Sequence, residues 1–184
     1  TNSVAGSPVT YPGLLRFNGD VTIQAIGDID FTHTGTIVGA GPTNQLVLTG
    51  SGNGRIAGIL DLGASGVTKT GTGRWTLDGA NTYTGATQIN AGTLRAGHAN
   101  ALGGTAGGTS VANGATLELG ASTGNLTIAN ESLSLASGAR VHNVQGDNAW
   151  SGSLSLAGSA TTQVDTGTAL TFSNPANVTV GNGA

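Results

Sequence analysis

The stretch that decides the fold is Gly66–Gly97, GVTKTGTGRWTLDGANTYTGATQINAGTLRAG. Apolar and polar residues alternate over short distances, as in Trp75-Thr76-Leu77, and this period of two is typical of a strand with one buried face. Turn residues such as Asp78-Gly79 separate the short strands, because glycine adopts positive φ without steric cost. The same rhythm continues on both sides of the stretch.

Pairs of apolar residues two positions apart recur along most of the chain. They include Val21 and Ile23, Ile29 and Phe31, Leu46 and Leu48, Leu60 and Leu62, Leu117 and Leu119, Leu126 and Ile128, Leu133 and Leu135, Leu154 and Leu156, Leu170 and Phe172, and Val178 and Val180. Neighbouring pairs start about 7 to 9 residues apart, or about twice that, so three short strands would use roughly 21 to 27 residues. That period indicates a stacked repeat architecture.

The pattern predicts an all-β fold, a parallel β-helix (β-solenoid) of roughly seven to eight coils. Almost no window carries the i, i+3, i+4, i+7 spacing of an amphipathic helix, and frequent glycine penalises helices further. A hairpin meander or a sandwich also suits short strands with glycine turns. The solenoid is favoured because strands with one or two apolar side chains bury too little for a sandwich face, whereas stacked coils pool these contributions.

Composition narrows the classes of function. The 184-residue chain has a net charge of −3, which provides no basic surface for nucleic acid. No apolar run approaches the roughly 18 residues of a membrane helix. Cysteine is absent, and Gly, Ser, Thr and Asn are abundant, which suits an exported bacterial surface protein. Since no initiator Met or signal peptide opens the chain, we expect a mature or excised segment with an extracellular or cell-surface location.

The stretch Gly66–Gly97 resembles the passenger-associated transport repeat, also called the autotransporter-associated β-strand repeat. The matching positions are Gly66-Val67-Thr68-Lys69-Thr70-Gly71, Gly73, Trp75-Thr76-Leu77, Gly79, Asn81-Thr82-Tyr83-Thr84-Gly85 and Ile89-Asn90-Ala91-Gly92-Thr93-Leu94. Residues 52–66 resemble the strand that precedes this repeat, Leu102-Gly103 resembles the link after it, and residues 148–174 resemble a looser module of the same proteins.

The resemblance implies a right-handed parallel β-helix that is exported through the outer membrane of a Gram-negative bacterium. In that family the repeat is associated with efficient secretion and folding of the passenger, and the outer-membrane barrel that follows a passenger is not in this chain. We interpret residues 1–184 as a single β-solenoid segment. It comprises irregular N-terminal coils in 1–45, transport-repeat coils in 52–104 and further coils in 105–184.

Three groups of polar residues are candidate sites. Asp28 and Asp30 share a strand with Asp20 nearby, but a solvated strand face is favoured over Ca²⁺, which takes six to eight oxygens. The glycine run Gly50–Gly54 is interpreted as a turn rather than a phosphate loop, since no helix or Gly-Lys-Ser/Thr follows it. The histidines, His33, His98 and His142, are far apart and lack acidic partners at a recurrent spacing, so no metal or catalytic role is assigned.

Aromatic and amide side chains suggest two further roles. Trp75, Tyr83 and Trp150 are candidate sugar-stacking platforms, although we expect Trp75 in the core and Trp150 at a coil corner. Turn asparagines could hydrogen-bond to one another in ladders along the rod. The candidates for such ladders are Asn81, Asn90, Asn113, Asn125, Asn130 and Asn148.

The sequence therefore predicts a non-enzymatic surface protein with no catalytic, cofactor-binding or metal-binding residues. The first hypothesis is a stalk or scaffold for adhesion or matrix building, with a host-surface or matrix ligand as partner. The second is a subunit of an extracellular fibre that self-associates end to end, because an open solenoid end presents unpaired backbone groups. The third is a polysaccharide-active enzyme, which would need clustered carboxylates on one face.

Overall fold

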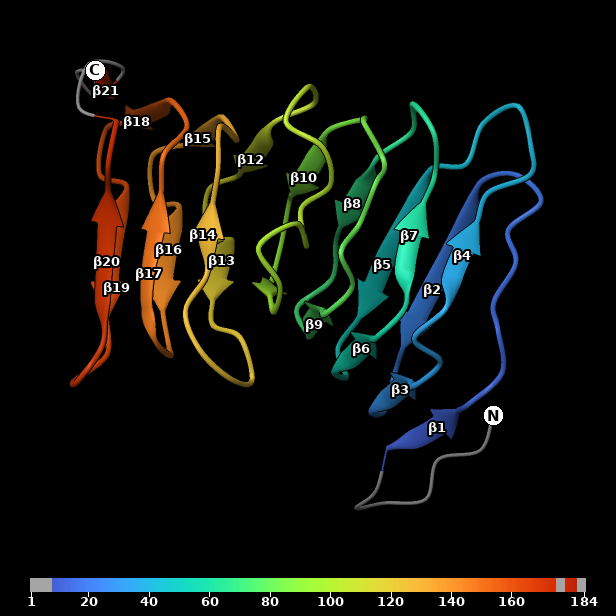
Figure 1. Ribbon diagram of the computed structural model, residues 1–184. Helices are drawn as coiled ribbons and strands as arrows, with labels where there is room; N and C mark the ends of the chain where they lie inside the picture. The colour runs from blue at the N-terminus through green and yellow to red at the C-terminus, as the bar shows by residue number, and fades with distance from the viewer. Residues whose placement is uncertain (1–7, 175–177, 182–184) are drawn as a thin grey trace.

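The structure, a computed structural model, describes residues 8–174 and 178–181, and these form one stack of short parallel strands (Figure 1). No helix occurs among these residues, and so none that is long and apolar enough to cross a membrane. Every strand pairing is parallel, and the stack makes about seven turns, which confirms the predicted β-solenoid.

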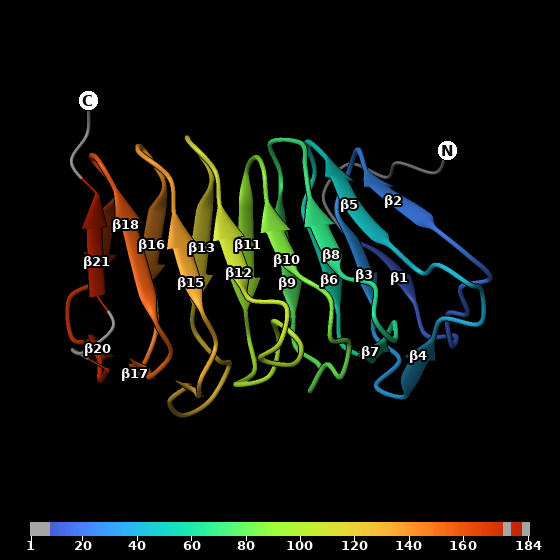
Figure 2. The ribbon, with the colours of Figure 1, turned by 90° about the horizontal axis from the view of Figure 1, so that it is seen from above.

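Two long sheets form two faces of the solenoid and lie one behind the other in Figure 2. The first sheet contains, in order, β1 (Val9–Tyr11), β3 (Ile29–Phe31), β6 (Gly54–Ile56), β9 (Arg74–Leu77), β11 (Thr93–Ala96), β13 (Thr116–Leu119), β16 (Arg140–Asn143) and β19 (Thr161–Val164). The second sheet contains β2 (Val21–Ala25), β5 (Leu46–Gly50), β8 (Val67–Lys69), β10 (Thr87–Ile89), β12 (Thr109–Val111), β15 (Leu133–Leu135), β18 (Leu154–Ala157) and β21 (Val178–Gly181).

The third face is interrupted. Its N-terminal part is a two-stranded sheet of β4 (Thr36–Val38) and β7 (Ile59–Asp61). Its C-terminal part is a three-stranded sheet of β14 (Thr127–Ile128), β17 (Asp147–Trp150) and β20 (Ala169–Phe172). Between β7 and β14 the chain crosses this face twice as loops, drawn in green to yellow in Figure 1.

The core is a column of apolar side chains that repeats once per coil. Leu94 lies in register between Trp75 and Leu117, and all three are fully buried. The predicted apolar pairs up to Leu135 lie mostly in this core, whereas Leu156, Leu170 and Phe172 are only partly buried. The side chains of Val178 and Val180 lie outside the described part of the chain.

Glycines allow successive coils to turn at the same corner. Gly71 and Gly92 both have positive φ, at 70° and 66°. A Cβ atom on Gly92 would lie 2.4 Å from the carbonyl oxygen of Gly71, one coil below. A Cβ atom on Gly71 would in turn lie 2.5 Å from the backbone nitrogen of Gly50. Both positions therefore need glycine for conformation and for close packing.

Gly54 provides a test of how tightly the coils pack. It lies in register with Trp75, and a Cβ atom there would lie 2.4 Å from two ring carbons of that indole. We expect Gly54→Ala to lower the free energy of unfolding by about 1–3 kcal/mol through overpacking. Urea denaturation of the purified chain measures this change.

Gly27→Ala is the matched control. Gly27 is exposed, has no positive φ, and a Cβ atom there would meet nothing within 4 Å. Its substitution is expected to change stability by less than about 0.5 kcal/mol. Equal effects of the two substitutions would contradict the close contact between Gly54 and Trp75.

Candidate functional site

The stretch Gly66–Gly97 folds into one and a half coils that stack on themselves. Its strand β8 pairs with its own β10, so that Val67 lies beside Thr87. Its strand β9 pairs with its own β11, so that Trp75 lies beside Leu94. The repeat therefore contains two neighbouring strands of the first sheet, β9 and β11, and two of the second sheet, β8 and β10.

Lys69 is buried inside this repeat, an arrangement that the sequence did not reveal. Its side chain is fully buried, and the ammonium Nζ donates to the carbonyl oxygens of Thr70, Gly71 and Ala91 at 2.6, 3.0 and 3.1 Å. Desolvation by burial lowers the pKa of Lys69 to about 8. The ammonium thus joins two coils at the corner after β8, where these carbonyl groups are no longer part of a strand pairing and need another hydrogen-bond donor.

A second buried polar group joins three coils. Asn81 Oδ1 accepts from the N–H of Leu60 at 2.8 Å, and Asn81 Nδ2 donates to the carbonyl of Ala101 at 2.6 Å. The loops of the third face form no regular strand pairing at this point, and the amide side chain supplies the hydrogen bonds that a paired strand would otherwise provide.

Tyr83 is likewise fully buried within the repeat. Its hydroxyl lies 2.6 Å from Thr87 Oγ1, which donates to the carbonyl of Leu102 at 2.9 Å. Because the hydroxyl hydrogen of Thr87 is used there, Tyr83 is the donor in the first bond. Burial raises the pKa of Tyr83, which keeps it neutral as a donor.

Replacing Lys69 by Met tests the buried ammonium. Methionine fills a similar volume but donates no hydrogen bond, so three carbonyls lose a partner and we expect a loss of about 1–3 kcal/mol at pH 7. The pKa of Lys69 is lowered in the folded state, so the unfolded state binds more protons between pH 8 and 10.5. Stability of the parent chain should therefore rise over that window, by up to about 3 kcal/mol, and Lys69→Met should remove the rise.

Gln88→Met is the control for that experiment, because Gln88 is exposed on the neighbouring strand β10. Denaturant unfolding at a series of pH values measures both effects. A pH profile unchanged by Lys69→Met would show that the lysine is not the titrating group.

The acidic residues Asp20, Asp28 and Asp30 do not converge on a common site. Asp20 and Asp28 each accept a backbone N–H from the next coil, from Gln45 at 2.9 Å and from Asn53 at 3.0 Å. Asp30 pairs instead with Arg55 at 3.1 Å, and the same guanidinium reaches Asp78 on the coil beyond at 2.6 Å. Within residues 8–174, no three acidic or histidine side chains are placed to hold a metal ion.

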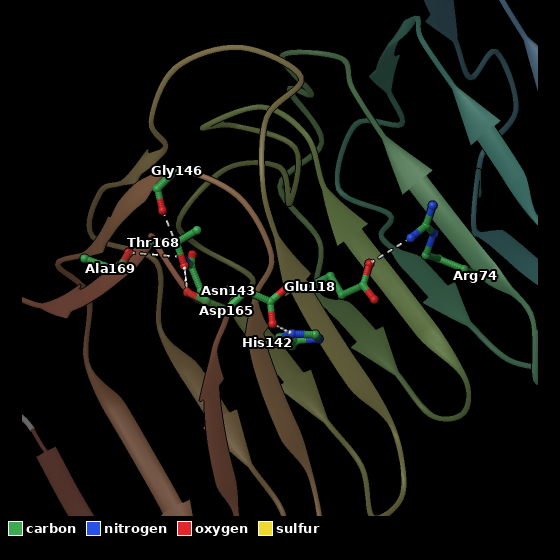
Figure 3. A network of polar contacts seen from close by, with 8 residues as sticks. All are labelled: Arg74, Glu118, His142, Asn143, Gly146, Asp165, Thr168 and Ala169. Atoms are coloured by element: carbon green, nitrogen blue, oxygen red, sulfur yellow. Dashed lines mark hydrogen bonds and ion pairs between the residues drawn. The ribbon is translucent and has the colours of Figure 1, made fainter.

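The three histidines occupy separate places. His33 Nδ1 accepts from the Gly35 N–H, and His98 Nδ1 accepts from the Asn100 N–H. His142 Nε2 lies 2.7 Å from Asp165 Oδ1, one coil further along (Figure 3). This acidic partner is 23 residues away, so only the register of the coils reveals it.

The remaining predictions have mixed outcomes. Residues 51–53 form the turn between β5 and β6, as predicted for the glycine run. Trp75 is in the core as expected, but Trp150 is also fully buried, in strand β17, so its placement at a coil corner was wrong. With Tyr83 buried as well, none of the three rings is open to stack on a sugar.

The asparagine ladder is wrong for the six predicted residues. Across the described residues, no hydrogen bond joins two of their side chains; Asn81 and Asn125, for example, bind backbone groups of adjacent coils. Asn148 does bind an asparagine, Asn143, at 2.6 Å, but within the same coil. The coils differ in length, so turn asparagines do not lie above one another, and their amides bind the backbone instead.

Asn143 organises the C-terminal coils and was also missed. Its buried Nδ2 donates to the carbonyls of Gly146 and Ala169 and to the hydroxyl of Thr168, at 2.9–3.1 Å (Figure 3). It occupies the register position that Leu119 fills one coil earlier. No sequence signal marks this change from an apolar to an amide core residue.

Glu131 is the buried acid that sequence reasoning passed over. Its side chain accepts a hydrogen bond at Oε1 from Thr109 Oγ1 at 2.9 Å, and its backbone carbonyl accepts from Trp150 Nε1 at 2.6 Å. Only 2% of Glu131 is exposed, and this desolvation raises its pKa to about 7.

Glu131 should make stability depend on pH. Because its folded pKa lies above the ordinary value of 4.5, the folded state binds more protons between pH 4.5 and 7, and its contribution is lost as pH rises through that window. We expect Glu131→Gln to flatten this decline and to raise stability at pH 8 by up to about 3 kcal/mol. Unfolding at pH 4.5 and pH 8, with Glu118→Gln as a control at an ion-paired acid, measures the difference. A decline that persists in Glu131→Gln would assign it to other groups.

A cleft of about 420 Å³ opens on the third face beside Glu131, and we call it the third-face cleft. It lies where the loops of the repeat region face β14. Its lining residues are Asn81, Thr82, Ala99, Asn100, Leu102, Gly103, Gly104, Thr105, Ile128, Ala129 and Glu131.

Comparison with known proteins confirms the resemblance seen in the sequence. Residues 67–96 match the family model of the passenger-associated transport repeat. The chain is also 38% identical over 133 residues to the adhesin BmaC autotransporter of Brucella suis biovar 1 (strain 1330). That alignment covers 72% of this chain and 3% of the adhesin. No solved structure gives a significant match.

Proposed function

We propose that this chain, which contains an autotransporter passenger repeat within a β-solenoid, is a stretch of cell-surface passenger that serves as a stalk or adhesion scaffold. The similar protein from Brucella suis is named as an adhesin, and this chain spans only 3% of its length. Adhesion is therefore proposed for the protein to which this segment contributes, and the segment itself holds the binding parts away from the membrane.

The observation that carries the proposal is the self-stacked repeat. Residues 67–69 pair with 87–89, and residues 74–77 pair with 93–96, so the repeat contains two adjacent strands of each long sheet. In a solenoid each coil contacts only its neighbours, and folding can start at one place and propagate along the rod. Short loops between paired strands lower the entropic cost of that first step.

The repeat would thus assist secretion by supplying a folding nucleus. As the passenger leaves the outer membrane, two stacked coils offer strand edges to which the strands of later coils can hydrogen-bond. The repeat also buries three polar side chains that are each hydrogen-bonded, those of Lys69, Asn81 and Tyr83. These bonds fix the register of the strands in the nucleus, in addition to its apolar contacts.

A structural role without enzymatic activity is part of the proposal. It is supported by the adhesin relative and by the structural nature of the matched repeat. End-to-end association into fibres stays a separate prediction, and light scattering over a concentration series measures it.

Two buried tryptophans test the role of the repeat in secretion. Trp75 lies inside the repeat and Trp150 outside it, and both are fully buried with a hydrogen-bonded indole N–H. Each substitution by Ala should cost about 3–5 kcal/mol of stability. If the repeat nucleates folding, Trp75→Ala should lower the amount of chain displayed on the cell surface several-fold more than Trp150→Ala does.

The measurement places the chain between a signal peptide and an outer-membrane barrel and detects it by antibody on intact cells. Denaturant unfolding of the purified variants establishes that the two substitutions are matched in stability. Equal display of two equally destabilised variants would contradict a special role of the repeat.

A further inference from the structure

The third-face cleft exists because two successive coils separate there. The coils are joined at Gly120 N–H to Ala96 O, 3.1 Å, and again at Thr109 N–H to Ser132 O, 2.8 Å. Between these points no backbone hydrogen bond connects residues 97–108 to residues 121–131, all of which the structure describes. The separation leaves an opening about 420 Å³ in volume, which is within the range of ligand pockets, about 300–1,000 Å³.

One wall of the opening is an unpaired strand edge. Among the described strands, β14 is the first strand of its sheet and pairs only with β17, on the side away from the cleft. Alternate backbone groups of a parallel strand point to its two sides, so N–H and C=O groups around Ala129 face the cleft. These groups supply both hydrogen-bond donors and acceptors at its mouth.

Glu131 supplies a polar atom to the lining of the cleft. Its Oε1 is occupied by Thr109, whereas Oε2 has no hydrogen bond to any described residue. Within the described chain, no side-chain oxygen or nitrogen that is sealed from solvent lacks a partner. Oε2 is therefore open to the cleft, although the residue as a whole is 2% exposed. A buried polar atom with an open hydrogen-bonding position favours a ligand that fills it.

The other lining groups define the chemistry of that ligand. Thr82, Asn100 and Thr105 contribute exposed hydroxyl and amide groups, and Leu102 and Ile128 contribute apolar surface. No Lys, Arg or His is among the lining residues, so an anion would find no countercharge there. A single carboxyl group falls short of the oxygens that a divalent cation takes. A neutral ligand with several hydroxyl groups and a C–H face fits these surroundings.

We propose that the third-face cleft binds one neutral sugar unit of a glycan, with Glu131 Oε2 hydrogen-bonded to a sugar hydroxyl. This inference goes beyond the passenger role, which does not require a ligand, and it adds an adhesive contact to the side of the rod. Burial raises the pKa of Glu131 to about 7, so a large fraction of this carboxyl group is protonated near pH 7. In that form the carboxyl group is neutral and can donate a hydrogen bond to a sugar hydroxyl.

The test is a titration of the ¹⁵N-labelled 184-residue chain with glucose, galactose, mannose and N-acetylglucosamine, followed by amide chemical shifts. We expect at least one of these sugars to shift the amide signals of Gly103, Gly104 and Ala129, which line the cleft, in a saturable way. For so small a ligand the dissociation constant should be on the order of 1 mM. Sialic acid serves as the charged comparison, and it should bind at least several-fold more weakly because its carboxylate would find no countercharge among the lining residues.

Two substitutions close the cleft and one matched substitution leaves it open. Ala129 and Thr105 are exposed lining residues, so Ala129→Phe and Thr105→Phe should fill the opening without entering the core. Each should reduce the binding of the sugar at least tenfold. Ala157→Phe, at an exposed residue of β18 on another sheet, should leave binding unchanged. Far-ultraviolet circular dichroism of each variant confirms that it is folded.

Two results would overturn the proposal. The first is an absence of saturable shifts at the cleft amides with all four neutral sugars. The second is binding that survives both cleft-filling substitutions, which would place the sugar elsewhere. Neither result bears on secretion, because the display of Trp75→Ala and Trp150→Ala is measured without any ligand.

Discussion

The rest of the structure depends on hydrogen bonding between successive coils held in register. Each coil contributes short strands with one or two apolar side chains, and such a strand is not stable alone. Parallel pairing stacks Trp75, Leu94 and Leu117 into one column, so that small buried areas add to a continuous core. The register also forces glycine where backbones approach, as at Gly92 above Gly71. Coil length can change only where another group takes over the backbone hydrogen bonds.

Buried polar side chains form hydrogen bonds to the backbone groups that the ladder leaves unpaired. Lys69 binds three carbonyls at a corner, Asn81 connects three coils through one amide, and Asn143 binds the turn that follows it and the next coil. Each lies where the chain leaves the regular ladder, and within the described residues no sealed side-chain nitrogen or oxygen lacks a partner. These residues stabilise the fold through satisfied hydrogen bonds, and they also select one register, because a shift by one residue would leave each group without its partners.

The three faces of the solenoid differ in what they offer to the surroundings. The outer surface of the first sheet carries ion pairs that cross coils, such as Arg55 with Asp30 and Asp78, and Arg74 with Glu118. Exposed pairs of this kind contribute little to stability individually, but they place alternating charge along the rod. The second sheet presents uncharged side chains such as Gln88, Ser110 and Ser134 at the corresponding outward positions. In the part of the chain that the structure describes, only the third face is interrupted, and the interruption creates the cleft beside Glu131.

The parallel β-solenoid and its approximate number of coils could be predicted from the amino-acid sequence, because period-two apolar pairs and turn glycines are local signals. The transport repeat was recognised by its resemblance over Gly66–Gly97, and the family model matches residues 67–96. The sequence also placed Trp75 in the core. It did not place Trp150 there, or pair His142 with Asp165, or reveal the partners of Lys69 and Glu131. Those contacts join residues about one coil apart, and the coils vary in length, so the partner of a given residue is undefined until the register is known. The tertiary structure decided them because backbone pairing sets that register, and the environment of each polar side chain follows from it.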